Sequence, residues 1–125
     1  HAMRDGIADY AGLLSLVTGS LGKIGQDVAL MAQQGIDDVT LTVGGGSSAM
    51  PHKSNPVLAE LLMTLARFNA TQLSGVHHAL VHEQERSGAA WMLEWMILPQ
   101  MSVTTARALT ASQALCAQIR AVGKA

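Results

Sequence analysis

Residues 7–31 read IADYAGLLSLVTGSLGKIGQDVALM, and this stretch decides the fold class. Its large apolar and aromatic residues recur at alternating spacings of three and four, which predicts a long helix packed nearly parallel to its neighbours. The positions of this pattern are Ile7, Tyr10, Leu14, Val17, Leu21, Ile24, Val28 and Met31. The glycines within the stretch would each cost up to about 1 kcal/mol in an isolated helix. We therefore expect neighbouring helices to hold this one, with close approach at the glycines.

A second helix is predicted on the far side of a long connection. Gly35 ends the first pattern, and the connection runs to Asn55. Asn55 is expected to cap the second helix, with Pro56 at its first position, where the missing N–H costs nothing. The helix is expected over residues 57–82. Its apolar stripe consists of Leu58, Leu61, Leu65, Phe68, Val76 and Leu80.

The third predicted helix covers about 89–122 and follows Gly88, which interrupts the pattern. Pro99 is expected to break or kink this helix near Leu98, because a proline removes a helix hydrogen bond and crowds the preceding turn. The apolar positions on its three-and-four lattice are Leu98, Met101, Ala108, Leu115, Ile119 and Val122.

Together the three helices predict an all-α fold, a bundle of long helices. At 1.5 Å per residue each helix is about 40 Å long. A compact chain of this size has a radius of gyration of only about 14 Å. Helices of that length need partners in other chains, so we expect an intertwined homo-oligomer with this chain in its core.

Composition and charge disfavour nucleic-acid-binding and membrane proteins. Of the 125 residues, 49% are apolar and 14% are charged, so the chain can bury a substantial core. The formal net charge of −1 disfavours a nucleic-acid-binding surface. The single cysteine, Cys116, excludes an internal disulfide and fits a reducing compartment. Because no apolar run or signal pattern suggests a membrane, we expect a soluble cytoplasmic protein without nucleic-acid or membrane partners.

Residues 44–56, GGGSSAMPHKSNP, interrupt the helical pattern with the parts of a catalytic loop. The glycines let the backbone approach a ligand closely, and Ser47 and Ser48 supply hydroxyl groups. His52 and Lys53 place cationic or proton-carrying groups beside the start of a helix, a position that favours anions. The combination indicates a carboxylate substrate. The alternative is a solvated Gly/Ser linker that ends in a helix cap.

Residues 46–55, GSSAMPHKSN, resemble the signature loop of the fumarase/aspartase superfamily, G-S-S-x-M-P-x-K-x-N, at every fixed position. Glu60 also falls where that pattern often continues. The resemblance implies that residues 1–125 are one segment of the central helical-bundle domain of that fold. The signature loop would lie at 35–55, and the chain would run towards a C-terminal domain. The family's N-terminal domain and two further active-site segments are missing, so we expect no activity from this chain alone.

Three other segments are similar to the bacterial 3-carboxy-cis,cis-muconate cycloisomerases within this superfamily: HAMRD, GSLGKIGQDVALMAQQ and VHEQERSGAAWMLEWMILPQM. The nearest rival is adenylosuccinate lyase, which shares GSSAMPHK but typically continues with ERD…SSVER to bind a nucleotide phosphate. Here Ala and Trp stand where that pattern has Ser and Arg, and Trp cannot bind phosphate as Arg does. The alternatives are a superfamily lyase that releases fumarate and a non-catalytic helical oligomerisation module.

The cycloisomerase resemblance implies conversion of 3-carboxy-cis,cis-muconate to 4-carboxymuconolactone, in the protocatechuate branch of the β-ketoadipate pathway. One substrate carboxylate adds to the substrate's own double bond, and the carbanionic carbon is then protonated. Neither a metal nor an organic cofactor is expected, because protein donors stabilise the developing charge. The expected partners are a small-molecule polycarboxylate substrate and further copies of the chain, as a homotetramer with shared active sites.

The same resemblance implies roles for the residues of the loop. Ser47 would transfer the proton and Lys53 would hold the reacting carboxylate. The choice of proton-transfer residue stays open among Ser47, Ser48 and His52. The expected substrate-binding residues are Ser48, Met50, His52, Asn55 and Arg86.

Arg86 and the histidines after the second helix allow more than one explanation. Arg86 lies in the polar break HEQERSG, where it either contacts a substrate carboxylate from another subunit or pairs with Glu83 or Glu85. His78 and His82 are spaced to share one helical face, but a third ligand is missing from the pattern, so no metal site is expected.

The remaining polar and aromatic candidates are expected to be structural. Trp91 and Trp95 share a helical face and are expected to pack. Arg4, with Asp5, is expected to form an ion pair between helices or subunits. Cys116 has no base partner in the pattern and is expected to be an inert, packed thiol.

Overall fold

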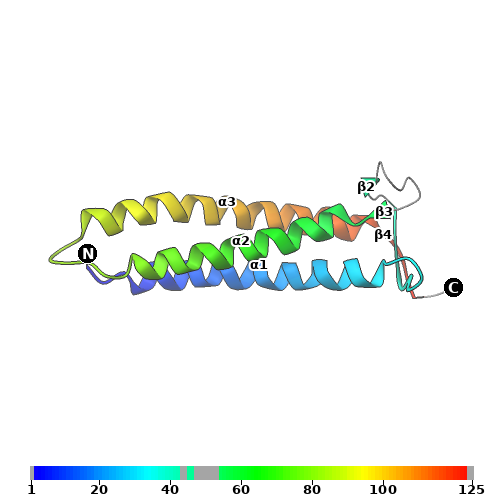
Figure 1. Ribbon diagram of the computed structural model, residues 1–125, viewed down its shortest axis with the longest axis horizontal. Helices are drawn as coiled ribbons and strands as arrows, with labels where there is room; N and C mark the ends of the chain where they lie inside the picture. Colours follow the sequence, from blue (N-terminus) through cyan, green and yellow to red (C-terminus); the bar gives the residue numbers. More distant parts are fainter. Residues whose placement is uncertain (1, 43–44, 47–53, 124–125) are drawn as a thin grey trace.

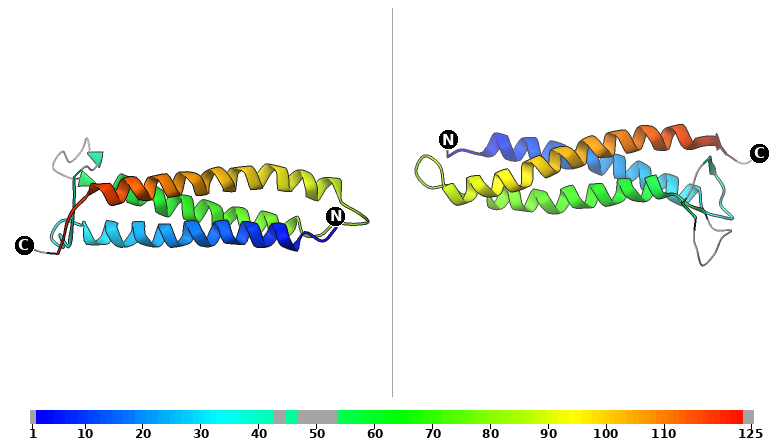
Figure 2. Two further views of the ribbon diagram at one scale, coloured as in Figure 1. Left: turned by 180° about the vertical axis from the view of Figure 1, so that it is seen from behind. Right: turned by 90° about the horizontal axis from the view of Figure 1, so that it is seen from above.

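A computed structural model describes residues 2–42, 45–46 and 54–123. Long helices lie side by side along a rod in Figure 1. They are α1 (Asp5–Met31), α2 (Val57–His78) and α3 (Gly88–Gln118). α1 and α3 run in one direction and α2 in the other, as all the views show (Figures 1 and 2). The predicted all-α fold is confirmed.

Short strands form two ribbons at one end of the bundle. They are β1 (Val39–Leu41), β2 (Gly45–Gly46), β3 (Ser54–Asn55) and β4 (Ile119–Val122). β1 pairs antiparallel with β4, and β2 pairs antiparallel with β3. The helix predicted to reach Val122 is therefore wrong at its end: α3 stops at Gln118, and the following residues pair with β1. The sequence pattern did not predict either ribbon.

The close helix approach predicted at the glycines is confirmed at two positions on α1. A Cβ added to Gly25 would lie 2.6 Å from the carbonyl oxygen of Ala59, and one added to Gly22 would lie 2.6 Å from Cβ of Ala66. By contrast, a Cβ at Gly12 or Gly19 would meet no atom within 4 Å. Two glycines therefore bring the backbones of α1 and α2 together, and the other two do not.

The buried face of α1 differs from the predicted pattern. Its buried residues are Ala11, Leu14, Thr18, Gly22, Gly25 and Val28. Two positions of the predicted pattern, Tyr10 and Ile24, are 46% and 45% exposed. Because a close interface selects small side chains, glycine and alanine mark the face towards α2 better than the large apolar residues do.

Two apolar clusters fill the core, with a polar layer between them. The cluster beside the strands contains Val28, Val39, Ala59, Leu62, Ala108, Ala111 and Leu115. The cluster at the other end contains Ala11, Leu14, Val76, Ile97 and Met101. Between them, Nδ2 of the buried Asn69 on α2 donates to Oγ1 of Thr18 on α1 at 3.2 Å and of Thr105 on α3 at 3.1 Å. Oδ1 of Asn69 is buried without a hydrogen-bond partner among the described residues. The layer still favours one helix register, because a shift would also break the two bonds that Nδ2 donates.

Three predicted helix boundaries also change. Asn55 is not the cap of α2: it lies in β3, and Pro56 occupies the cap position without a side-chain hydrogen bond. α2 ends at His78 instead of residue 82. The predicted break at Leu98 does not occur, and α3 continues through Pro99. Pro99 and Trp95 are both exposed, and Pro99 has no N–H to donate to the Trp95 carbonyl one turn earlier.

Candidate functional site

The signature loop begins and ends at the strand end of the bundle (Figure 1). The backbone of Asn55 in β3 pairs with Gly45 in β2, and this pairing closes the base of the loop. The predicted loop residues Ser47, Ser48, Met50, His52 and Lys53 lie outside the described residues. The structure thus gives the base of the loop and the helix ends around it.

The base of the loop is tied to the end of α3. The Thr42 N–H donates to the carbonyl oxygen of Gln118 at 2.8 Å, and its hydroxyl donates to the same oxygen at 3.2 Å. At the other end of the β1–β4 ribbon, the Gly123 N–H donates to the Asp38 carbonyl oxygen at 2.7 Å. These bonds fix the chain that enters the signature loop against the chain that leaves α3.

Arg86 lies in the α2–α3 connection, at the opposite end of the bundle from β2 and β3 (Figure 1). Its guanidinium carbon is 4.0 Å from the centre of the Trp91 ring, a cation–π contact. It takes part in none of the ion pairs found among the described residues, so the alternative of pairing with Glu83 or Glu85 is not observed. Arg86 is exposed, and its cation is available to an anion.

Arg86 and the base of the signature loop lie too far apart for one small substrate to contact both within one chain. α2 alone has 22 residues and separates them by about 33 Å. A small polycarboxylate cannot span that length. If both act on one substrate, they must come from different copies of the chain.

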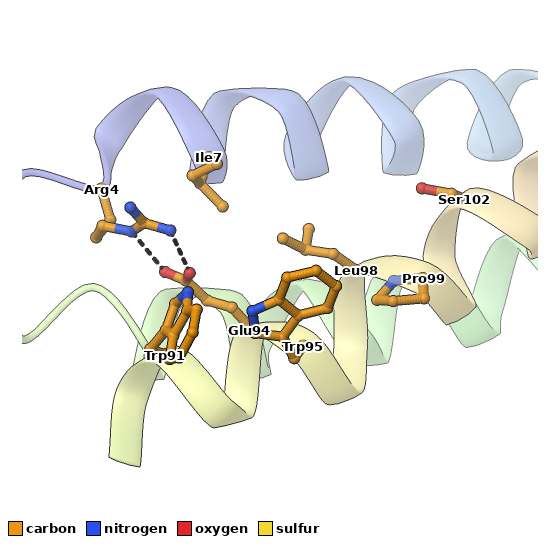
Figure 3. Close-up of a pocket in the computed structure, with 8 residues that line it drawn as sticks. All are labelled: Arg4, Ile7, Trp91, Glu94, Trp95, Leu98, Pro99 and Ser102. Carbon is orange, nitrogen blue, oxygen red and sulfur yellow. Dashed lines mark hydrogen bonds and ion pairs between the residues drawn. The ribbon is translucent and has the colours of Figure 1, made fainter. Parts of the chain in front are cut away.

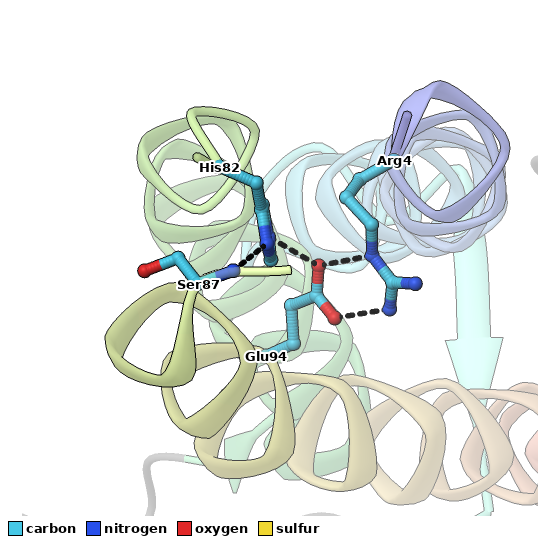
Figure 4. Close-up of polar contacts among 4 residues, drawn as sticks. All are labelled: Arg4, His82, Ser87 and Glu94. Carbon is cyan, nitrogen blue, oxygen red and sulfur yellow. Dashed lines mark hydrogen bonds and ion pairs between the residues drawn. The ribbon is translucent and has the colours of Figure 1, made fainter. Parts of the chain in front are cut away.

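A buried polar network lies beside Arg86 and joins α1, the α2–α3 connection and α3 (Figure 4). Arg4 Nε donates to Glu94 Oε1 at 2.9 Å, and Arg4 Nη2 donates to Glu94 Oε2 at 2.5 Å. His82 Nδ1 accepts the Ser87 backbone N–H at 3.0 Å, and its Nε2 lies 3.6 Å from Glu94 Oε1. The expected pairing of Arg4 between helices is confirmed. Its partner Glu94, and the contact of Glu94 with His82, were not predicted.

Arg4 and Glu94 change each other's proton affinity. The hydrogen bond from Arg4 lowers the pKa of the Glu94 carboxyl, burial opposes that shift, and the charge of Arg4 and the contact with His82 lower it further. The pKa of Arg4 is raised, chiefly by the same hydrogen bond. Glu94 is only 3% exposed, so the carboxylate depends on this arginine for its charge.

Loss of this ion pair is expected to destabilise the chain in acid. Because Arg4 holds the pKa of Glu94 low in the folded state, the unfolded chain binds the Glu94 proton more readily. The stabilisation is fully present above the ordinary glutamate pKa and is lost as pH falls towards the lowered one. We expect Glu94→Gln to lower the free energy of unfolding by about 2 kcal/mol at neutral pH and to flatten its decline between about pH 5 and 3.

Urea unfolding followed by circular dichroism at several pH values measures this effect. Glu83→Gln, at an exposed position in the α2–α3 connection, is the matched control and should leave the acid decline unchanged. Equal pH dependence in the Glu94→Gln variant and the unchanged chain would contradict the role given to the pair.

A groove of about 360 Å³ lies between α1 and α3 next to this network (Figure 3). It is lined by Arg4, Ile7, Trp91, Glu94, Trp95, Leu98, Pro99 and Ser102. Trp91 and Trp95 meet edge to face, with ring centres 6.3 Å apart. Trp95 is 65% exposed, so the expectation that it packs is not met within this chain. The groove is largely apolar, and its arginine and glutamate are bound to each other, so its charge is already neutralised.

Two further expectations need correction. His78 and His82 do not share a helical face, because α2 ends at His78 and the side chain of His82 is buried in the connection. Cys116 is exposed on α3, so it is not a packed thiol. In the part of the chain that the structure describes, no helix is both long and apolar enough to cross a bilayer.

Comparison with known proteins identifies the family. A sequence model of the lyase family matches residues 1–90. The chain belongs to the lyase family. This confirms the superfamily resemblance that the signature loop gave, and it agrees with the long-helix fold.

Individual relatives of this lyase chain match most of its length. The 3-carboxy-cis,cis-muconate cycloisomerase of Acinetobacter baylyi is 41% identical over 112 residues, covering 87% of the chain and 25% of that protein. The nitrosuccinate lyase of Streptomyces davaonensis is 40% identical over 101 residues, covering 78% of the chain and 21% of that protein. A crystal structure of the 3-carboxy-cis,cis-muconate lactonizing enzyme from Pseudomonas putida matches with a TM-score of 0.83 and 36% identity, over 96% of the chain and 26% of that structure. The lyase chain therefore spans about a quarter of the length of these relatives.

Proposed function

We propose that the whole protein containing this lyase chain is a cycloisomerase that converts 3-carboxy-cis,cis-muconate to 4-carboxymuconolactone. The observation that carries the proposal is the 41% identity to a 3-carboxy-cis,cis-muconate cycloisomerase, which extends over 87% of the chain. The chain would form part of the central helical domain and run towards a C-terminal domain. The rest of the protein would supply the remaining active-site segments.

In this reaction the substrate attacks itself. A carboxylate oxygen forms a C–O bond to one carbon of a double bond, and the electron pair moves to the neighbouring carbon. That carbon lies next to a second carboxylate, which takes up the charge as a dianionic aci-carboxylate. The carbon then accepts a proton, and the lactone is complete. The substrate carries several carboxylates, so the site needs cations and hydrogen-bond donors more than it needs a metal or a cofactor.

The signature loop would supply the groups that act on the reacting atoms. Ser47 donates the proton, Lys53 binds the carboxylate on which charge develops, and Asn55 donates a hydrogen bond to it. A serine hydroxyl is a weak acid in water, so Ser47 depends on nearby cations and on exclusion of solvent. Ser48, Met50 and His52 would complete the contacts to the substrate.

The site would be shared between copies of the chain in a homotetramer. Two observations support this: the separation of Arg86 from the loop, and the large apolar residues exposed along the helices. Five of these side chains are 56–71% exposed: Leu13 and Leu16 on α1, and Met92, Met96 and Val103 on α3. Association of the helices would bury these side chains and bring the loop of one copy near Arg86 of another.

A second candidate is elimination from a substituted succinate with release of fumarate. The nitrosuccinate lyase of Streptomyces davaonensis, at 40% identity, favours it, because that relative is nearly as similar as the cycloisomerase. The two candidates run related chemistry in opposite directions, and they differ in the product. Ultraviolet loss of the muconate diene by the purified whole protein supports the cycloisomerase, while fumarate formed from a succinyl adduct without diene loss supports the lyase.

Ser47→Ala in the whole protein is expected to lower kcat for lactonisation by about 10²-fold to 10⁴-fold, the range for loss of a proton-transfer group. The rate of diene loss at saturating substrate measures it. Ser48→Ala tests whether the neighbouring hydroxyl transfers the proton in place of Ser47. Ser20→Ala, on the exposed surface of α1, is the control for a serine outside the loop. Near-normal kcat of Ser47→Ala would remove Ser47 from proton transfer and leave Ser48 and His52.

A further inference from the structure

His82 closes the α2–α3 connection at the residue after Arg86. Its Nδ1 accepts the backbone N–H of Ser87 at 3.0 Å, a bond that spans the connection from one side to the other. Ser87 is 7% exposed and stands at the cap position of α3, without a side-chain cap bond. The bond therefore satisfies a buried N–H at the start of the helix and fixes the backbone beside Arg86.

The same bond determines which nitrogen of His82 carries the proton. Because Nδ1 accepts from Ser87, the neutral ring has its hydrogen on Nε2. Nε2 is buried and has no hydrogen-bond partner among the described residues. It faces Oε1 of Glu94 at 3.6 Å, and Arg4 holds that carboxylate with two hydrogen bonds. The ring thus sits between a fixed backbone donor and a fixed carboxylate (Figure 4).

Both the backbone and the side chain of Arg86 are held in place. Its backbone joins Ser87, which His82 binds, and its guanidinium lies 4.0 Å from the ring centre of Trp91 in the first turn of α3. The cation–π contact keeps the long side chain against α3 while the charge remains open to solvent. An arginine pre-arranged in this way loses less conformational entropy when it binds a carboxylate.

We propose that His82 is a positioning residue for Arg86, acting through the Ser87 N–H, and that Glu94 and Arg4 hold its ring in place. The inference rests on the proposed function, in which Arg86 binds a carboxylate of the substrate. His82 does not touch the substrate. Its contribution is to substrate binding, because Arg86 binds a substrate carboxylate while the signature loop of another copy supplies the proton transfer.

The test compares two nearly isosteric replacements in the whole protein. His82→Asn keeps an oxygen near the place of Nδ1 and can still accept from Ser87, whereas His82→Leu cannot. We expect His82→Leu to raise KM for the muconate about tenfold with kcat changed less than about threefold. His82→Asn is expected to keep KM within about threefold of the unchanged protein, even if both variants melt at a lower temperature.

A double-variant cycle separates positioning from general destabilisation. Arg86→Met is expected to raise KM at least as much as His82→Leu does. Once Arg86 is gone, His82→Leu should change KM by less than about twofold, because the two residues act on the same contact. Equal KM values for His82→Leu and His82→Asn, or a full His82→Leu effect in the Arg86→Met background, would overturn the inference while leaving the substrate contact of Arg86 intact. Unchanged KM in Arg86→Met, or no turnover by the unchanged protein, would overturn the proposed function and the inference with it.

Discussion

Gly25→Ala is expected to destabilise the chain by about 2–3 kcal/mol, the cost of overpacking a tight core. The added Cβ would lie 2.6 Å from the carbonyl oxygen of Ala59 and 2.9 Å from Cβ of Leu62. Neither atom is the far end of a flexible side chain, so the backbones of α1 and α2 would have to separate. That separation would also loosen the apolar cluster that contains Val28 and Leu62.

Gly19→Ala is the matched control on the same helix. Gly19 is exposed and has no atom within 4 Å of an added Cβ. Alanine there gains helix propensity, so the expected change is a stabilisation of up to about 1 kcal/mol. Urea or thermal unfolding of both variants, followed by circular dichroism, gives the two free energies. Stabilisation of the same size in both variants would mean that α1 and α2 do not meet at Gly25.

The contrast between these glycines shows why the sequence predicts the helices better than their contacts. The three-and-four spacing of apolar residues is a local property, and it predicted α1 from Ile7 to Met31 within a few residues. The face that α1 buries depends on the helix opposite. Gly22 and Gly25 meet α2 while Gly12 and Gly19 do not, although all four are the same residue in the same helix.

The sequence did not predict the polar layer of the core either, because this layer also depends on how the helices pack. Asn69 follows Phe68 in α2 and has no local feature that marks it as buried. Its partners Thr18 and Thr105 are 51 and 36 residues away and lie on two other helices. Only the packing of three helices at one level gives the amide its partners. Strand β4 is similar, because the pairing partner of residues 119–122 is β1, 78 to 83 residues earlier in the chain.

In the candidate site, too, the sequence predicted the local feature and missed the contacts between distant residues. A contiguous motif, GSSAMPHKSN, identified the family from the sequence, because the chemistry of a loop resides in neighbouring residues. The network of Arg4, His82 and Glu94 has no such motif: Arg4 and Glu94 are 90 residues apart. The one available signal was Arg4 at the start of a helix, which indicated an ion pair but not the partner. The sequence therefore located Arg86 but not the residues that hold it.

The length of the helices has the largest consequence for function. The bundle places Arg86 at one end and the base of the signature loop at the other, about 33 Å apart along α2. If Arg86 and the loop both act on the substrate, as proposed, one chain contributes to two active sites, with its loop in one and Arg86 in another. In that arrangement, the loop and Arg86 of one subunit belong to two different active sites. A substitution in the loop therefore impairs one of these sites, and a substitution of Arg86 impairs the other.

Mixing two damaged subunits is therefore expected to restore activity to the whole protein. Lys53→Met removes the loop cation, and Arg86→Met removes the cation at the other end. In hybrids formed from equal amounts, about one site in four takes its loop from an Arg86→Met subunit and its Arg86 from a Lys53→Met subunit, if assembly is random. We expect about a quarter of the unchanged activity after the two variants are co-refolded, measured as diene loss at substrate concentrations well below KM.

The matched control mixes Lys53→Met with Ser47→Ala, two variants of the same loop. Every loop in those hybrids carries one defect or the other, so activity should stay at the level of the separate variants. If the Lys53→Met and Arg86→Met mixture behaved like this control, one site would take both residues from one chain, or Arg86 would take no part in it. The length of α2 rules out the first explanation for any small substrate, so failure of the mixture would remove Arg86 from the active site.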